Sequence, residues 1–294
     1  MIDLKTEVKV LFVLCSLFVA SCSDDDENVT IDTSTLTLNL SGLEDLGSDY
    51  LYEGWVIIDG VPVSTGTFSV DDNGTPSNGT IMMDADQLAM ATKFVLSIEP
   101  NPDPSPSPAE TKIFVGDFVG NTATLGTETV ASSFDNVAGS FIIAAPTGTG
   151  TEEEKYSGVW FLDNSSGTPV AGLELPELEA GWKYEGWVVI DGVPVTTGTF
   201  TSVSGADEMA PFSGGNPGPM YPGEDFLINA PQDLQFPTDV RGKVAVVSIE
   251  PFPDNSPNPF TLKPLAGMIA VDAEGVQNID SNVTASFPTG TVTR

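Results

Sequence analysis

The stretch YEGWVIIDGVPVSTGTF, Tyr52 to Phe68, recurs almost letter for letter as YEGWVVIDGVPVTTGTF, Tyr184 to Phe200. In each copy, two apolar runs rich in Val and Ile flank an Asp-Gly pair. Asp-Gly between strand-like runs is a strong hairpin signal, because a type I′ turn needs positive φ at both central residues. Each copy therefore predicts a β-hairpin, and the repetition predicts an internal duplication.

A second pair of matching segments follows the hairpins. Residues 93–98 and 243–249 are strand-like, and both run into Ser-Ile-Glu-Pro. A proline-rich segment comes next in each case, NPDPSPSP at 101–108 and FPDNSPNP at 252–259. Proline lacks the backbone donor that a central strand needs, so these two segments are expected to be stiff extended loops.

The rest of the chain also favours strands. Alternating or apolar runs predict them at 30–40, 111–118 and 261–271, whereas 82–92 is the one helix candidate. The two repeats close on 141–149 and 287–291, each of which contains Pro-Thr-Gly-Thr. Many short strands with 29 Gly and 23 Pro are typical of antiparallel β-sandwiches. The predicted fold class is all-β, with two tandem antiparallel β-sandwich domains related by internal duplication, at residues 30–150 and 151–294.

The N-terminus has the pattern of a secretory signal. Lys5 and Lys9 precede an apolar run at 10–20 that is too short to span a bilayer as a helix. The run ends in Val-Ala-Ser-Cys, which resembles a bacterial lipobox, so residues 1–21 are expected to be a cleaved lipoprotein signal peptide and Cys22 the lipidation site. The alternative is a plain signal peptide with an incidental cysteine.

An acidic tether is expected at 22–29, because the run Asp24 to Glu27 is too charged to pack. Such a run after the lipidated cysteine is similar to the export tags of surface lipoproteins of Bacteroidetes-type bacteria, although it could also serve only as a spacer. The expected location is the outer membrane, lipid-anchored through Cys22, at the cell surface of a Gram-negative bacterium.

Composition excludes several kinds of chemistry. The chain has 10 Lys and Arg against 42 Asp and Glu, a formal charge of −32 and no His. Without His there is no catalytic triad, no HExxH zinc site and no imidazole base. The charge repels nucleic acid, so no nucleic acid partner is expected. Cys15 would leave with the signal, so no thiol, metal site or cofactor is expected; the acidity is interpreted as a solvated surface rather than a cation site.

Four glutamates and four tryptophans are the other candidate catalytic or binding residues. Glu53 and Glu99, repeated as Glu185 and Glu250, could serve a glycosidase, but a pair present in both copies is better explained by hydrogen bonds of the fold, so no enzyme is predicted. The tryptophans common to the two copies could be glycan platforms, but their apolar surroundings favour the core. These two are Trp55 and Trp187; Trp160 and Trp182 lie outside the repeat and are the better candidates for exposure. Residues 71–74, DDNG, are interpreted as a turn rather than a calcium loop.

The repeated motifs resemble the extracytoplasmic C-terminal domain of anti-sigma-K-type factors. The resemblance rests on the signature residues Tyr52, Trp55 and Ser-Ile-Glu-Pro ending at Pro100, and again on Tyr184, Trp187 and Ser-Ile-Glu-Pro ending at Pro251. It implies a β-sandwich outer module. The cytoplasmic sigma-binding domain and transmembrane helix of that family have no counterpart here, so the resemblance does not imply a working anti-sigma factor.

Two functions follow as alternatives. The first is a non-catalytic cell-envelope lipoprotein acting as an extracellular binding or structural module, with a protein or glycan as ligand. The second is an accessory sensor in envelope signalling, which a neighbouring sigma-factor gene would favour.

An insertion in the second copy is the predicted contact site. The tryptophans of the two copies are 132 positions apart (Trp55 to Trp187) and the glutamates 151 (Glu99 to Glu250), so the second copy holds 19 more residues between them. These residues fall within 201–239, where aromatic and Met side chains occur among Gly and Pro. A long apolar loop is typical of a ligand or partner contact. The predicted contacts are Phe212, Met220, Tyr221 and Phe226.

Cys22→Ser is expected to release the protein from membranes, because no later segment of the sequence is long and apolar enough to hold a bilayer. Membrane fractions washed in high salt and probed for the protein measure this. A Cys15→Ser variant is the control and should stay with the membrane. Retention of Cys22→Ser in the washed membranes would disprove lipid anchoring at this residue.

Overall fold

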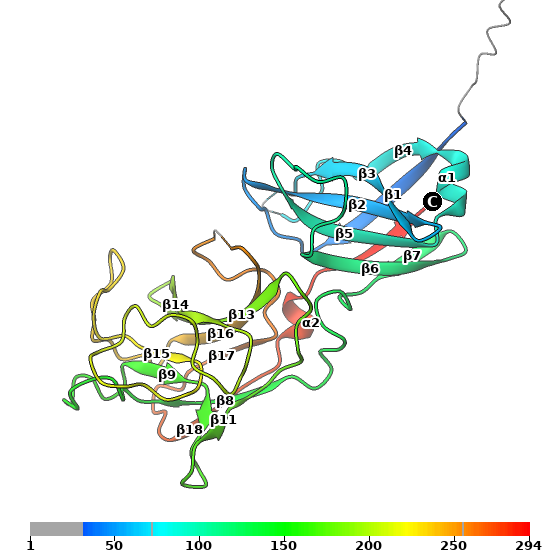
Figure 1. Ribbon diagram of the computed structural model, residues 1–294. Helices are drawn as coiled ribbons and strands as arrows, with labels where there is room; N and C mark the ends of the chain where they lie inside the picture. The colour runs from blue at the N-terminus through cyan, green and yellow to red at the C-terminus, as the bar shows by residue number, and fades with distance from the viewer. Residues whose placement is uncertain (1–31, 72, 255) are drawn as a thin grey trace, which may run out of the picture. The chain divides into compact units, whose positions relative to one another are not determined.

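The computed structural model describes residues 32–294 apart from Asp72 and Asn255. The expected signal peptide, the tether and Cys22 lie outside the described residues. Residues Asp32–Arg294 form one compact unit built from antiparallel β-sheets, with two short helices among the described residues (Figure 1). The predicted all-β, sandwich-like architecture is therefore confirmed. Within the described part of the chain, no helix is long and apolar enough to cross a membrane.

The first group of strands forms an eight-stranded path in the order β3-β2-β5-β6-β7-β19-β1-β4. In β1, Leu36 and Leu38 are buried, whereas the residues between and beside them are less buried, as expected for a strand with one face on the core. The strands are β1 (Thr33–Ser41), β2 (Tyr50–Ile58), β3 (Val61–Phe68), β4 (Thr80–Asp84), β5 (Lys93–Pro100), β6 (Lys112–Val119), β7 (Thr122–Leu125) and β19 (Thr289–Thr293).

The second group contains two larger sheets. One has the order β14-β13-β16-β17, and the other has the order β12-β8-β9-β15 with β18 also paired to β8; β10 and β11 form a small separate pair. The strands are β8 (Ala138–Ile143), β9 (Gly158–Trp160), β10 (Leu162–Asp163), β11 (Val170–Ala171), β12 (Leu173–Glu174), β13 (Trp182–Ile190), β14 (Val193–Phe200), β15 (Gly223–Asp225), β16 (Val244–Pro251), β17 (Leu265–Met268) and β18 (Val276–Ile279).

The two predicted hairpins are confirmed, and they share one geometry. Asp59 and Gly60 have φ of 50° and 79°, and Asp191 and Gly192 have φ of 51° and 87°, as a type I′ turn requires. Both hairpins change register at the same position, between Gly and Trp of the motif. Glycine is needed there, since a Cβ on Gly54 would lie 2.4 Å from the Thr65 hydroxyl oxygen.

The predicted helix over 82–92 is shorter in the structure. It is α1 (Ala85–Met90), and it begins where the Asp84 side chain accepts a hydrogen bond from Gln87 N at 2.9 Å. Residues 80–84 instead pair with β1 as strand β4, because Ile81 and Met83 alternate inward onto the core.

The strand predicted at 261–271 is shorter in the structure, because only β17 forms there. In the segment 141–149, which closes the first repeat, β8 ends at Ile143. The run at 287–291 follows a helical turn, α2 (Val283–Ser286), and becomes β19.

Strand pairing crosses the predicted domain boundary at 150. β8, from before it, pairs with β9, β12 and β18 of the second group. β19, from far beyond it, pairs with β1 and β7 of the first group, and its Val292 is fully buried there. The domain bounds 30–150 and 151–294 stay a prediction. In the structure, one strand from each side of residue 150 pairs with strands of the other group.

Arg294 holds the end of β19 against α1. Its guanidinium donates to the backbone carbonyls of Leu88 (2.8 Å), Ala89 (3.2 Å), Ala91 and Gly120 (3.2 Å). It also lies over the Phe118 ring, 4.5 Å from the centroid. This side chain therefore binds carbonyls at the C-terminal end of α1 together with the carbonyl of Gly120.

Arg294→Met is expected to lower the free energy of unfolding by roughly 1.5–3 kcal/mol, because charge-assisted bonds to these carbonyls are lost. Urea denaturation followed by far-UV circular dichroism measures it. Lys93→Met is the matched control, since Lys93 pairs with Asp117 at the surface (3.0 Å) and should cost about 1 kcal/mol or less. Equal losses in the two variants would contradict the role given to Arg294.

Candidate functional site

A buried hydrogen-bond chain joins the first hairpin to the first proline-rich loop. The indole nitrogen of Trp55 donates to the Ser97 hydroxyl at 2.8 Å, and that hydroxyl donates to the Glu99 carboxylate. The carboxylate in turn accepts the backbone N–H of Ala109 at 2.8 Å. Glu99 thus closes the loop that starts at Pro100.

The same chain recurs in the second copy. Trp187 donates to Ser248 at 2.8 Å, and Ser248 donates to Glu250. The Glu250 carboxylate oxygens lie 3.0 and 3.2 Å from the backbone nitrogen of Phe260, which donates to them. We refer to Trp55–Ser97–Glu99 and Trp187–Ser248–Glu250 as the Trp–Ser–Glu chains.

The other two glutamates of the repeat are also bonded within the fold. Ser64 donates to Glu53 and Thr196 donates to Glu185, across each hairpin. Burial raises the pKa of Glu53, that of Glu185 to about 7 and that of Glu250 to about 8. The hydrogen bonds of the four repeated glutamates therefore hold the hairpins and the proline-rich loops in place.

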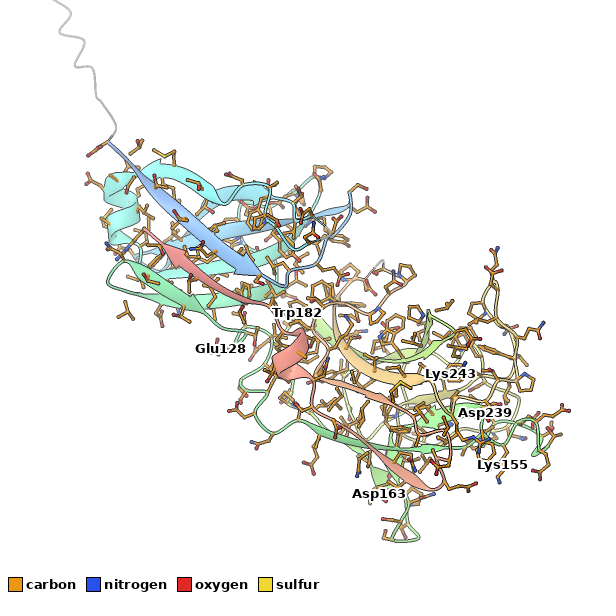
Figure 2. The ribbon with its side chains drawn as sticks, turned by 180° about the vertical axis from the view of Figure 1, so that it is seen from behind. Glu128, Lys155, Asp163, Trp182, Asp239 and Lys243 are labelled. Carbon is orange, nitrogen blue, oxygen red and sulfur yellow. The ribbon has the colours of Figure 1, made fainter. Side chains whose placement is uncertain are left out.

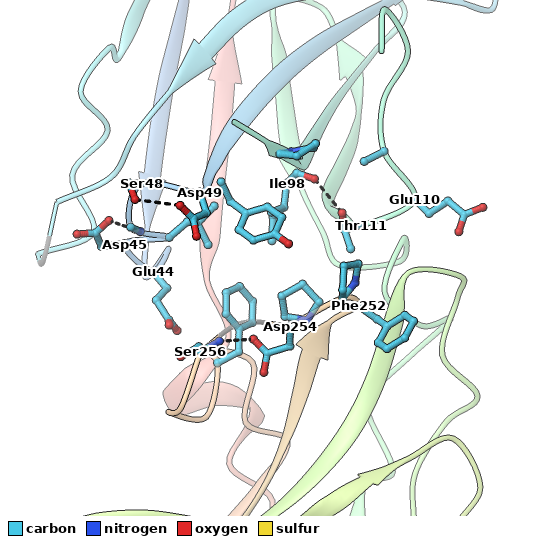
Figure 3. A pocket seen from close by; sticks show the side chains of 18 residues that line it. Glu44, Asp45, Ser48, Asp49, Ile98, Glu110, Thr111, Phe252, Asp254 and Ser256 are labelled. Atoms are coloured by element: carbon cyan, nitrogen blue, oxygen red, sulfur yellow. Dashed lines mark hydrogen bonds between the residues drawn. The ribbon is translucent and has the colours of Figure 1, made fainter. Parts of the chain in front are cut away.

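A cavity of about 570 Å³ lies where the residues on either side of the first proline-rich loop and the second proline-rich loop meet the β1–β2 loop (Figure 3). Three segments of the chain build it: the β1–β2 loop, the end of β5 with residues 109–111 just before β6, and the end of β16 with the loop that follows. Its lining consists of Glu44, Asp45, Leu46, Gly47, Ser48, Asp49, Tyr50, Ile98, Pro100, Ala109, Glu110, Thr111, Pro251, Phe252, Pro253, Asp254, Ser256 and Phe260. We call it the inter-loop cavity.

The inter-loop cavity is acidic. Among its described lining residues there are five carboxylates and no lysine or arginine. Figure 3 shows Glu44, Asp49 and Asp254 around one end and Glu110 at the other. Burial raises the pKa of Glu44 to about 7, opposed mainly by the charge of Lys263 nearby. Burial in turn lowers the pKa of Lys263.

The remaining wall is apolar and aromatic. Ile98 and Phe260 are each 3% exposed, whereas Phe252 is 55% exposed. The ammonium of Lys183 lies over the Phe252 ring, 4.0 Å from its centroid. A polar end and an apolar wall in one cavity of this size are typical of small-ligand sites.

All four tryptophans are buried. Trp55 is 1% exposed and Trp187 3%, and neither offers a face to a ligand. Trp160 and Trp182, the better candidates for exposure, are each 4% exposed, so that expectation is not met. Trp182 begins β13 (Figure 2) and packs at a tilt against Phe260 of the inter-loop cavity, with ring centroids 6.2 Å apart.

The inserted loop packs inward through its aromatic residues. Phe226 is fully buried, and Phe212, Phe226 and Phe236 form one ring cluster with centroids 5.6 to 6.3 Å apart. Met220 is 70% exposed, and the Tyr221 hydroxyl donates to the Pro169 carbonyl at 2.9 Å. Of the four contact residues predicted for this loop, Met220 and Tyr221 therefore remain candidates. Phe212 and Phe226 instead pack in the aromatic cluster of the loop.

A smaller hollow of about 380 Å³ lies beside this loop, lined in part by Trp160, Asp207 and Met220. Asp225 ties the loop to the body, because its carboxylate accepts bonds from the Trp160 indole at 2.7 Å and from Thr147 N at 2.7 Å. Burial raises the pKa of Asp207 and of the adjacent Glu224 to about 7. Backbone N–H groups of the loop donate to both of these carboxylates, so the acids beside the hollow hold the loop in place.

The segment 71–74 forms a turn in its described residues. The Asp71 carboxylate accepts the backbone N–H groups of Asn73 and Thr75, both at 2.9 Å. Asp72 lies outside the described residues. Over residues 32–294 without the two gaps, no group of three or more His, Cys, Asp or Glu is arranged to hold a metal ion.

Comparison with protein-family models, curated proteins and solved structures gave no match for this chain. The resemblance to anti-sigma-K-type domains therefore stays a prediction.

The free energy of unfolding is expected to fall as the pH rises from 5 to 8. Glu250, with its pKa raised to about 8, binds a proton in the folded state over a range where the unfolded chain, with an ordinary pKa of about 4, has released it. The acids with pKa raised to about 7 contribute in the same direction: Glu44, Glu185, Asp207 and Glu224.

Urea denaturation at pH 5, 6, 7 and 8 measures this slope. Glu250→Gln should flatten it, because glutamine stays neutral throughout the range. Glu274→Gln is the control, since its pKa is lowered and it should leave the slope unchanged. An unchanged slope in Glu250→Gln would contradict the raised pKa of Glu250.

Proposed function

We propose that this protein is a non-catalytic binding module of the cell envelope, anchored to the outer membrane by lipid on Cys22, and that it takes its ligand in the inter-loop cavity. The observation that carries the binding role is the cavity itself, a space of about 570 Å³ with an acidic end and an aromatic wall. Its volume falls within the range of roughly 300–1,000 Å³ that small-ligand sites occupy.

The walls of this cavity are held in place, which supports a ligand role. Glu99 bonds to Ala109 N at 2.8 Å and Glu250 to Phe260 N at 3.0 Å, so each proline-rich loop is closed by a buried carboxyl group. A loop fixed before binding loses little conformational entropy when a ligand arrives.

The use of the repeated glutamates supports a module without catalysis. A glycosidase needs two carboxyl groups that face one substrate. Here Glu53 and Glu185 bond to hydroxyl groups across their hairpins, and Glu99 and Glu250 bond to loop amides. None of these four lines the inter-loop cavity.

The envelope location comes from the sequence. The lipobox-like residues before Cys22 and the acidic run after it support anchoring at the outer membrane and display at the cell surface. The two sandwich-like groups of strands would have arisen by duplication, which the shared register of the β2–β3 and β13–β14 hairpins supports. An extracellular protein or glycan is the expected source of the ligand.

Ala109→Phe is expected to weaken binding at least about tenfold, because the new ring fills part of the cavity that Ala109 lines. The ligand is first identified by screening glycans and peptides against the purified protein, and its affinity for both forms is then measured by isothermal titration calorimetry. The melting temperature should stay close to that of the parent.

Ala89→Phe is the matched control, because Ala89 is exposed on α1 and lines none of the cavities described above. It should bind the ligand as the parent does. A ligand that binds Ala109→Phe with full affinity would place the site elsewhere, with the exposed Met220 region as the next candidate.

A further inference from the structure

Each copy of the repeat forms the same corner, where the first strand of the hairpin begins beside the proline-rich loop. Tyr50 lies opposite Pro100 in the first copy, and Trp182 lies opposite Pro251 in the second. In both copies, the tyrosine two positions further along the strand donates its hydroxyl to the backbone carbonyl eight positions before it, at 2.9 and 2.8 Å. Tyr50 and Trp182 therefore occupy equivalent positions.

Ala109 and Phe260 are a second equivalent pair in this corner. Each donates its backbone N–H to the buried glutamate of the Trp–Ser–Glu chain in its own copy, at 2.8 and 3.0 Å. Two residues later, the carbonyl of Thr111 or Leu262 accepts the backbone N–H of the isoleucine in Ser-Ile-Glu-Pro, at 2.9 and 2.8 Å. The backbone is thus bonded in the same way in both copies, whereas the side chain is a methyl group in one and a phenyl ring in the other.

In the second copy, the corner is filled by its own aromatic side chains. Trp182 and Phe260 are both buried, and their ring centroids lie 6.2 Å apart. This separation is within the range of about 4.5–7 Å at which aromatic rings attract each other. In the first copy, Tyr50 and Ala109 are only half-buried, and both line the inter-loop cavity. Among the described residues, no aromatic ring is paired with Tyr50.

An alanine at the position of a large buried ring leaves room for a ring of the same kind. Apolar cavities of roughly 150 Å³ are large enough to bind benzene. The inter-loop cavity measures about 570 Å³, and its lining beside Tyr50 and Ala109 includes the apolar residues Ile98 (Figure 3) and Pro100. Phe260 of the second copy also lines it. The cavity therefore has room for an aromatic ring and for the group that carries the ring.

We infer that the inter-loop cavity binds an aromatic ring, which lies against Tyr50 beside Ala109 as the Phe260 ring lies against Trp182 in the second copy. This inference rests on the proposed function, because it names the chemistry of the ligand in the same cavity. Two sources offer such a ring: a free aromatic compound, and a phenylalanine or tyrosine side chain of an extracellular protein. The group recognised is the same in both.

Benzyl alcohol and cyclohexylmethanol test this inference, because they are similar in size, are both uncharged and differ in the aromaticity of the ring. Each is titrated into the purified protein, and NMR follows the ¹³C-labelled methyl group of Ala109 and the backbone amides of Tyr50 and Phe260. Benzyl alcohol should bind about threefold to tenfold tighter, since it adds a ring–ring contact to similar apolar burial. Its ring current should also shift the Ala109 methyl signal, whereas the saturated ring has no such current.

Tyr50→Leu should weaken benzyl alcohol by about threefold or more, and Tyr50→Phe should restore most of that loss because the ring is kept. Ala109→Phe should abolish binding, since the introduced ring takes the place that Phe260 occupies in the second copy. Tyr221→Leu is the matched control and should bind as the parent does, because Tyr221 is also half-buried but does not line the cavity. The Ala109 methyl shift in the parent protein is an independent readout if a variant unfolds.

N-acetylphenylalanine amide distinguishes the two sources of the ring. Tighter binding of this amide than of benzyl alcohol would support the inference and assign the ring to a side chain of an extracellular protein, because the peptide groups then add contacts. Exclusion of the amide while benzyl alcohol still binds would support the inference and assign the ring to a free aromatic compound.

Equal affinities for benzyl alcohol and cyclohexylmethanol would overturn the inference, and so would the absence of any shift at the three reporter residues with benzyl alcohol. The proposed function is judged separately, by the ligand found in the screen. If the inference failed and that ligand still lost affinity in Ala109→Phe, the cavity would remain the binding site for a ligand without an aromatic ring. If that ligand bound Ala109→Phe with full affinity, the proposed function would fail as well.

Discussion

The hydrogen bond from a buried indole to a buried serine is the interaction on which much of this structure depends. Trp55 and Trp187 each sit just after a register change in a hairpin, and each donates to a serine on the neighbouring strand. The serine hydroxyl donates in turn to a glutamate carboxylate, and this carboxylate accepts a backbone N–H at the far end of the loop that follows the strand. Core packing, strand pairing and loop closure are thus joined by one chain of bonds, and low dielectric surroundings make each bond costly to break.

Local features of the fold could be predicted from the sequence because local chemistry decides them. Asp59-Gly60 and Asp191-Gly192 specify their turns through positive φ, alternation indicates β1, and continuous apolar runs indicate β5 and β16. The same local logic failed where two patterns overlapped: the helix was expected to begin at residue 82, but residues 80–84 pair with β1 as a strand, and the Asp84 cap begins the helix at Ala85.

Long-range pairing could not be predicted in this way. The residues of β8 and β19 do not indicate which strands they pair with, because both lie between two neighbouring strands that come from distant parts of the chain. The inter-loop cavity was missed for the same reason: its walls come from three segments separated by up to about 200 positions in the chain. Its acidic residues were visible only as part of a general excess of Asp and Glu. The insertion was found, yet its aromatic residues proved to anchor it, since Phe212 and Phe226 pack with Phe236.

The two copies of the motif form the same hydrogen bonds but place different side chains at the cavity. Ala109 and Phe260 occupy equivalent positions, and both are fixed by a buried glutamate through the backbone N–H. Because the bond uses the backbone, the side chain is free to vary, and one copy presents a methyl group where the other presents an aromatic ring. The same hydrogen bonds therefore hold a proline-rich loop in place in each copy. The side chains that differ between the copies, together with the β1–β2 loop, give the cavity an acidic end and an aromatic wall, and neither copy has both alone.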